Sequence, residues 1–264
     1  MKERNILLTI EYDGTLFYGW QRQPEARTVQ GELEKVLSKV CGTEVLLNGT
    51  SRTDAGVHAL GQRASFKVKS GIPTDKIGTV TNNMLSGGKQ SRNKCADVRI
   101  TDVKEVSEDF HARFCSKGKK YRYLIRNEEE PAIFQRNYAY HVKEPLNIEW
   151  MQEACKYITG THDFACFQSA GGNPRETTVR TVYSLEVFPA EDGRIAIEIS
   201  GDGFLYNMVR IIAGTLVETG LGKRKPEELE EIIRSGDRRK AGHTAPPEGL
   251  YLVEVYYDES EAFL

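Results

Sequence analysis

The order of strands and helices constrains this fold most, because one pattern, β-α-β-β-α-β, is predicted twice along the chain. In the first half, residues 5–12 alternate apolar and polar side chains, which predicts a strand. Residues 28–41 carry apolar side chains at helical spacing, with Thr28 placed to cap the helix and Gly42 to end it. The pattern then predicts strands at 44–50 and 62–68, a helix at about 74–85 and a strand within 96–106.

The second half is predicted to repeat this order without repeating the sequence. Alternation at 121–126 predicts a strand, and a helix at about 148–158 has Asn147 as its cap. Asp192 and Gly193 form a hairpin signal between two further strands. The other predicted elements are strands at 179–187, 194–200 and 250–257, a helix at about 204–219, and a short helix with Pro226 in its first turn and Gly236 after its end.

Two copies of this order predict an α+β fold of two ferredoxin-like half-domains, residues 1–110 and 111–264. Each half would present an antiparallel sheet, and the sheets would flank a central cleft in which a ligand could sit. A chain of 264 residues should bury roughly 70–75% of its unfolded surface, so the fold needs no disulfides or metals to hold it together.

Sequence patterns argue against a membrane span, a secretory signal and a metal site. The best apolar candidate, Met208 to Val217, is interrupted by Arg210 and is shorter than the roughly 20 residues that span a bilayer. The N-terminal residues lead into a strand and show no signal-peptide pattern. The five cysteines are never spaced C-x-x-C, and the five histidines include no H-x-x-x-H pair. We therefore expect a cytoplasmic protein with reduced cysteines, no metal and no membrane partner.

Charged residues are segregated along the chain, although the net charge is only −2. Segregation of this kind can give a positive groove for a nucleic acid on a nearly neutral protein. The alternative is that each cluster is an ordinary solvated face. Basic residues gather at 117–122, 223–225 and 238–240, and acidic residues at 128–130, 227–231 and 258–261.

The segment Ser-Arg-Thr-Asp-Ala-Gly-Val-His-Ala at 51–59 is the most informative one for chemistry. Arg52 and Asp54 point the same way in an extended segment, and the arginine would favour the ionised carboxylate. Such a carboxylate could be a nucleophile, a base or the partner of a cation, or it could simply stabilise an Asx-turn. His58 could be a general base, although a lone histidine near a loop is more often hydrogen-bonded and structural.

Six motifs along nearly the whole chain resemble those of one family, in the same order and at its approximate spacing. This is the bacterial tRNA pseudouridine synthase A (TruA) family, which isomerises uridines in the anticodon arm of tRNA. The resemblance implies the pseudouridine synthase fold and the corresponding isomerase activity. The motifs are IEYDGTLFYGWQRQ at 10–23, SRTDAGVHA at 51–59, DFHARF at 109–114, KKYRYLI at 119–125, GDGFLYNMVRIIAG at 201–214 and EGLYLVEVYY at 248–257.

The resemblance also implies roles for single residues. Asp54 matches the essential catalytic aspartate, and Arg210 matches the arginine that pairs with it. Tyr121 matches the tyrosine that stacks on the target base, and Arg52 resembles the arginine that helps to hold the target uridine out of the helical stack. The family acts as a homodimer at positions 38 to 40 of tRNA. We therefore expect a homodimer with tRNA as its partner, no DNA partner and no cofactor.

Two departures from the family pattern stand out. Residues 82–99 lack the Leu-Pro and Asp-Ile pairs that members usually carry there, and they are predicted to form a longer, more basic loop. Ser51 stands where many bacterial members have Gly. Neither departure touches the assigned catalytic residues, but the loop bears on how this chain grips its RNA.

The implied reaction breaks the N1–C1′ bond of the nucleotide, turns the base and rejoins it through C5. It needs an anion beside the sugar, and Asp54 could attack C1′, add to C6 or remove the C2′ proton, of which we favour the last. It also needs the base to be extruded, at a cost of a few kcal/mol that stacking on Tyr121 would partly recover.

Two other functions compete with the isomerase. A non-catalytic RNA-binding protein of the same fold would tolerate loss of Asp54, Tyr121 or Arg210, and the presence of all three argues against it. A carboxylate-based glycosidase would need two acidic residues flanking one bond, whereas the segment 51–59 contains only one acid, Asp54.

Overall fold

The chain folds into two compact units, which this computed structural model describes over residues 2–87, 95–171, 176–190 and 192–258. The first unit comprises Met1–Lys117 and Leu252–Leu264, and the second comprises Gly118–Tyr251. The division therefore lies after the boundary at residue 110 that was expected from the sequence. The last strand, β10 (Leu250–Tyr257), belongs to the first unit from Leu252 onward, and in the sheet order it is a neighbour of β3 (His58–Val68).

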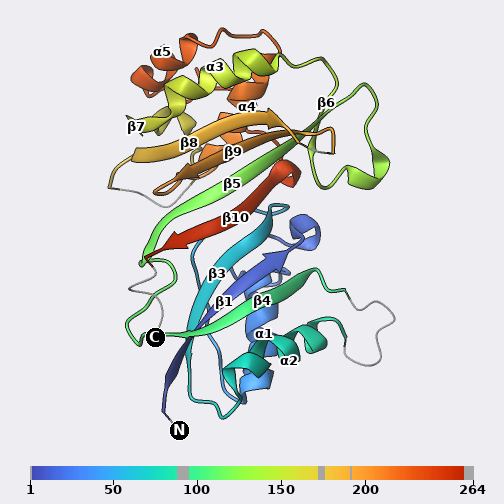
Figure 1. Cartoon of the computed structure of the whole chain (residues 1–264), viewed down its shortest axis with the longest axis vertical. Coiled ribbons are helices and arrows are strands. Elements are labelled where there is room, and N and C mark those ends of the chain that lie inside the picture. The colour runs from blue at the N-terminus through green and yellow to red at the C-terminus, as the bar shows by residue number, and fades with distance from the viewer. Residues whose placement is uncertain (1, 88–94, 172–175, 191, 259–264) are drawn as a thin grey trace. The chain divides into compact units, whose positions relative to one another are not determined.

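An antiparallel sheet and two helices make up the first unit (Figure 1). Strand β1 (Arg4–Tyr12) lies between β3 and β4 (Val98–Val106), and the short β2 (Asn48–Gly49) pairs with β3. The strands run β4-β1-β3-β10, with β2 off this path, and the elements follow one another along the chain in the β-α-β-β-α-β order expected for this half. The two helices lie side by side, and the second packs on β4; they are α1 (Val29–Cys41) and α2 (Thr74–Leu85).

The ends of α1 carry the caps that the sequence predicts. The side chain of Thr28 accepts a hydrogen bond from the backbone N–H of Gly31, which satisfies a donor of the first turn. Gly42 follows the last residue in the left-handed conformation, with φ +70°. The predicted start and end of this helix are confirmed.

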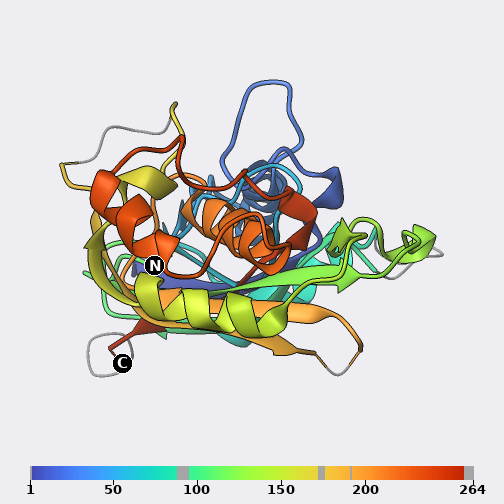
Figure 2. The same ribbon diagram turned by 90° about the horizontal axis from the view of Figure 1, so that it is seen from above.

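The second unit contains antiparallel strands in the order β5-β9-β8-β7, and β6 pairs in parallel with β5. Helix α3 packs against β8 and against both other helices of the unit, as Figure 2 shows from above. Both units combine helices with antiparallel strands, so the predicted α+β class is confirmed. The elements are β5 (Ser116–Asn127), β6 (Tyr140–Val142), α3 (Ile148–Ile158), β7 (Gly160–Asp163), β8 (Val179–Pro189), β9 (Ile195–Gly201), α4 (Met208–Gly220) and α5 (Glu228–Ser235).

The strand predicted at 44–50 is wrong over most of its length, since only Asn48 and Gly49 pair as β2. Val45 and Leu47 are buried, but their backbone N–H groups donate to Ser38 and Glu34 of α1. Side chains of a helix therefore replace the strand ladder that alternating apolar residues had predicted.

Two other boundaries differ from those expected. Helix α4 begins at Met208 and not near 204, because Asn207 adopts the left-handed conformation with φ 61°. The loop expected at 82–99 is shorter, since its first residues end α2 and its last two begin β4. Residues 88–94 of that loop lie outside the described residues. Strands β6 and β7 were not predicted at all.

Each unit encloses its own hydrophobic core. Strand β1 is buried along most of its length, and it contributes Ile6, Leu8 and Ile10 to the core of the first unit. Helix α4 is the main core element of the second unit, and all of its residues except Arg210 and Glu218 are buried. Within the described ranges, no helix combines the length and the apolar character that crossing a membrane requires.

Replacing Phe66 of β3 by alanine tests where the core of the first unit lies. The side chain is 1% exposed, so Phe66→Ala should lower the free energy of unfolding by about 3–5 kcal/mol. Leu60→Ala on the same strand is the control, because Leu60 is 46% exposed and its removal should cost less than about 1 kcal/mol. Urea unfolding followed by fluorescence measures both, and equal costs would contradict this placement of the core.

Candidate active site

Asp54 lies in the loop of residues 50–57, between β2 and β3 of the first unit. Burial alternates along the loop: Ser51 and Thr53 are buried, whereas Arg52 is exposed and Asp54 is partly exposed. This is the pattern of an extended segment with one face on the protein. The placement of Arg52 and Asp54 on the other face agrees with the sequence analysis.

Two buried side chains hold the inner face of this loop. Gln62 of β3 is 0% exposed; its Nε2 donates to the carbonyl of Ser51 at 2.7 Å, and its Oε1 accepts the N–H of Ser51 at 3.2 Å. The hydroxyl of Tyr12 lies 2.7 Å from Thr53 Oγ1. Because these polar groups are satisfied inside the unit, the backbone on both sides of Arg52 is fixed.

Residues 13–20, which include a short 3-10 helix at Gly14–Leu16, bind the same segment through backbone hydrogen bonds; this contact is here called the clasp. The N–H of Trp20 donates to the carbonyl of Thr53 at 3.0 Å, and the N–H of Gly56 donates to the carbonyl of Phe17 at 3.4 Å. A Cβ atom on Gly19 would lie 2.6 Å from the oxygen of Thr53. The motifs at 10–23 and 51–59, which are separate in the sequence, therefore form one substructure.

His58, the first residue of β3, lies against residues 13–20. Its side chain is buried at 2% exposure. Its Nδ1 accepts a hydrogen bond of 3.0 Å from the N–H of Gly14 and lies 3.3 Å from Oδ1 of Asp13. Asp13 caps the same turn by accepting from Thr15, and His58 thus helps to anchor the clasping loop.

Tyr121 lies on β5 in the second unit, opposite Ile199 of β9. Its ring is 8% exposed and packs edge-on against Phe204, with the ring centres 5.3 Å apart. Its neighbours Lys120 and Arg122 both bind the carboxylate of Glu198. Burial alone would raise the pKa of Glu198, but the hydrogen bonds from these two cations outweigh it and hold this pKa below its ordinary value.

Arg210 lies in the first turn of α4, and two contacts orient its guanidinium group. Its Nε donates to the carbonyl of Ala245 at 2.7 Å, and its NH1 donates to Oδ1 of Asn207 at 3.0 Å. The N–H of Ala245 also donates to the carbonyl of Arg210 at 3.1 Å, so two hydrogen bonds join these two residues. Hydrogen bonds on two sides of a planar group leave it little rotational freedom.

Ion pairs within the chain involve at least one residue of each predicted basic cluster. In the cluster at 117–122 the partner is Glu198, in that at 223–225 it is Glu218, and in that at 238–240 the partners are Asp237 and Glu231. Part of the positive charge that was expected to face an RNA is therefore neutralised by neighbouring acids.

Of the expected site residues, Arg52 and Asp54 belong to the first unit, and Tyr121 and Arg210 belong to the second. Sequence reasoning missed Gln62, which holds the Asp54 loop, and Asn207, which orients Arg210. A signal for Asn207 was present, since it stands directly before an apolar helix, at a position that favours asparagine. Among the described residues, no group of three or more His, Cys, Asp or Glu side chains is arranged to hold a metal ion.

Two glycine substitutions test the clasp around Asp54. Gly19 and Gly42 both have positive φ, so an alanine at either position should cost roughly 1–2 kcal/mol of backbone strain. A Cβ atom on Gly42 would meet nothing within 4 Å, whereas one on Gly19 would meet the oxygen of Thr53. Gly19→Ala should therefore be less stable than Gly42→Ala by a further 1–3 kcal/mol or so.

Urea unfolding measures this difference, and hydrogen exchange locates it. The amide of Trp20, which donates to Thr53, should exchange faster in Gly19→Ala than in Gly42→Ala. Equal stability and equal exchange in the two variants would mean that the clasp does not depend on close backbone approach.

Comparisons with known proteins identify the family. The family model described as tRNA pseudouridine synthase matches residues 8–115 and 154–258. The chain is 52% identical over 254 residues to tRNA pseudouridine synthase A of Ruminiclostridium cellulolyticum, covering 96% of this chain and 100% of that protein. With the same coverage it is 50% identical to tRNA pseudouridine synthase A of Acetivibrio thermocellus and 49% identical to tRNA pseudouridine synthase A 2 of Clostridium perfringens.

Among solved structures, the chain is similar to one in the archaeal box H/ACA sRNP Nop10-Cbf5 complex, with 9% identity and a TM-score of 0.33. That match covers 94% of this chain and 46% of the other. The assignment therefore rests on the sequence relatives. They align with this chain over their whole length and are identical to it at about half of the aligned positions. On that basis, the chain belongs to the tRNA pseudouridine synthase family.

Proposed function

We propose that this protein isomerises uridine to pseudouridine in tRNA, and that its targets are positions 38 to 40 in the anticodon stem-loop. The observation that carries the proposal is the identity of about 50%, over 96% of the chain, with relatives named tRNA pseudouridine synthase A. The isomerisation is redox-neutral and transfers no group to a second molecule, so the proposal includes no cofactor.

In this proposal Asp54 supplies the anion beside the sugar. Gln62 and residues 13–20 hold its loop by hydrogen bonds, and the side chain of Asp54 is partly exposed. A carboxylate fixed in place can take the C2′ proton, the step that we favour, without first paying to order its loop. The exposed side chain of Arg52, on the same face, would help to hold the extruded uridine.

Tyr121 and Arg210 complete the proposed machinery. Tyr121 would stack on the target base, and its edge contact with Phe204 keeps the ring from turning. Arg210 would pair with the catalytic carboxylate, and its contacts to Ala245 and Asn207 orient it before substrate arrives. The proposal also includes a homodimer that works in the cytoplasm on the anticodon arm of tRNA.

The substitution Asp54→Asn tests the catalytic role. Asparagine keeps the shape of the side chain and can still accept a hydrogen bond, but it cannot act as an anion. Tritium release from C5-labelled uridine in tRNA should fall at least about 100-fold, as expected for loss of a general base. The melting temperature and the affinity for tRNA should change little.

Asp97→Asn is the matched control, because Asp97 is also a partly exposed aspartate of the first unit and it pairs with Arg27. This variant removes the same charge and should keep normal turnover. Normal turnover by a folded Asp54→Asn variant would contradict the catalytic role. It would favour the second candidate function, an RNA-binding protein of the same fold.

Mapping pseudouridine in total tRNA tests the substrate. Carbodiimide labelling of tRNA from cells with and without the gene should show pseudouridine at positions 38 to 40 only when the gene is present. A change confined to another arm of tRNA would contradict the anticodon assignment and leave the isomerase activity standing.

A further inference from the structure

The two charged residues of α4 share one stripe of the helix. Arg210, Gly214 and Glu218 are spaced four residues apart, and this spacing places side chains along one face. Arg210 and Glu218 are also the only residues of α4 that are not buried, in an element whose residues are all described. The face of the core helix that meets polar surroundings is therefore this single stripe.

Residues 241–246, here called the strap, run along that stripe. The N–H of Gly242 donates to Thr215 Oγ1 at 2.9 Å, the N–H of His243 donates to Glu218 Oε1 at 2.9 Å, and Ala245 exchanges hydrogen bonds with Arg210. A Cβ atom on Gly214 would lie 2.0 Å from the oxygen of His243. The strap thus touches the backbone of α4, with Glu218 at one end and Arg210 at the other.

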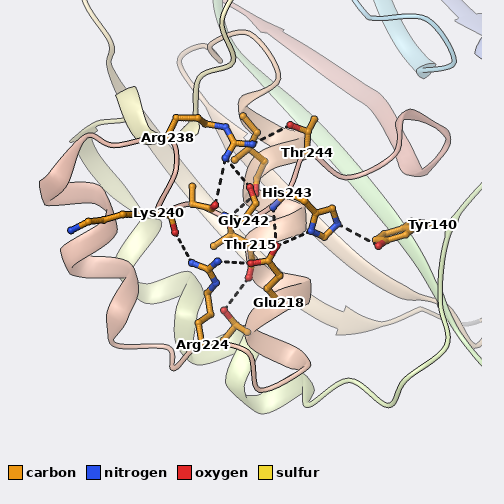
Figure 3. Close-up of polar contacts among 12 residues, drawn as sticks. Tyr140, Thr215, Glu218, Arg224, Arg238, Lys240, Gly242, His243 and Thr244 are labelled. Carbon is orange, nitrogen blue, oxygen red and sulfur yellow. Dashed lines mark hydrogen bonds and ion pairs between the residues drawn. The ribbon is translucent and has the colours of Figure 1, made fainter.

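Glu218 is the most heavily bonded group at its end of the strap. Figure 3 shows its carboxylate between Arg224 and His243, with Tyr140 beyond the histidine ring. Burial alone would raise the pKa of Glu218, but hydrogen bonds from His243 and Arg224 outweigh it and lower this pKa. The group is therefore an anion at neutral pH.

Two arginines also donate hydrogen bonds to the strap or to the residue directly before it. Arg224 NH1 donates to the carbonyl of Lys240 at 2.8 Å, directly before the strap. Arg238 donates to the carbonyl of Gly242 at 2.8 Å and to Thr244 Oγ1 at 3.2 Å. Figure 3 shows the contacts around Glu218, Arg224 and Arg238. The strap also supplies the carbonyl of Ala245, which accepts from Arg210 Nε.

We propose that Glu218 is a positioning residue for the reaction: it anchors the strap on α4 and, through the carbonyl of Ala245, sets the direction of the Arg210 guanidinium. This inference rests on the proposed function, in which Arg210 pairs with the catalytic carboxylate. Glu218 acts through Arg210 and not on the substrate. Its loss should therefore lower kcat while leaving KM for tRNA nearly unchanged.

Glu218→Gln is the test variant, since it keeps the volume and removes the charge. A displacement of about 1 Å at a reacting group can cost about 100-fold, so kcat should fall at least roughly tenfold, with KM within about twofold. Asn127→Ala is the matched control. Asn127 also fastens a segment of the second unit, donating to Val142 and Glu144 and accepting from Leu146, whereas the carbonyl that accepts from Arg210 Nε belongs to Ala245 of the strap. Its loss should lower stability and leave kcat unchanged.

A double-mutant cycle with Arg210→Lys separates positioning from general stability. If Glu218 acts through Arg210, Glu218→Gln should lower kcat much less in the Arg210→Lys background than in the native one. An equal loss in both backgrounds would overturn the proposal. So would a native kcat in Glu218→Gln.

Hydrogen exchange provides a readout that does not depend on activity. The amides of Gly242, His243 and Ala245 should exchange faster in Glu218→Gln, while that of Leu146 should change only in Asn127→Ala. Unchanged exchange along the strap would overturn the proposal on its own. Absence of pseudouridine formation by the wild-type protein would instead contradict the proposed function, so the two failures are distinguishable.

If Glu218→Gln does not fold, Thr215→Val serves in its place. Thr215 is fully buried, and valine has nearly the same shape but cannot accept the N–H of Gly242. The same fall in kcat and the same faster exchange of the strap are expected. A folded Thr215→Val variant with faster exchange and native kcat would overturn the proposal.

Discussion

Close approach of one backbone to another, possible only at glycine, underlies both candidate site segments. In the first unit a Cβ atom on Gly14 or Gly19 would lie 2.0 Å or 2.6 Å from a carbonyl oxygen of the Asp54 loop. In the second unit Gly214 and Gly242 bring the strap against α4 in the same way. Such contacts leave no room for a side chain, so the segments that they hold cannot drift without breaking hydrogen bonds.

Polar side chains, buried at Gln62 and partly buried at Glu218, then hold the segments that the glycines allow to approach. Gln62 satisfies both backbone groups of Ser51, and Glu218 accepts the backbone N–H of His243. A buried donor or acceptor without a partner costs about 1–3 kcal/mol, so each contact penalises alternative loop positions. Asp54 and Arg210 are thus each held by groups of their own unit.

Elements with a strong local pattern were predictable from the sequence. Helix α2 has the predicted bounds of 74–85, and β10 those of 250–257. Asn147 caps α3 as expected, by accepting the N–H of Trp150. The prediction of a strand at 44–50 failed because the backbone N–H groups of its buried residues donate to side chains of α1. An alternation of apolar residues does not reveal such contacts. Asn207 likewise turns the chain before α4 and delays the start of that helix.

The sequence by itself determined the α+β class, the caps of α1 and α3 and the family, and it proposed the candidate site residues, because each depends on neighbours in the chain or on a short motif. The tertiary structure alone decided which groups hold those residues. Gln62 meets Ser51, and Ala245 meets Arg210, across separations of 11 and 35 residues. Periodicity carries no information about such partners, since they are chosen by which backbones the packed core brings within hydrogen-bond distance.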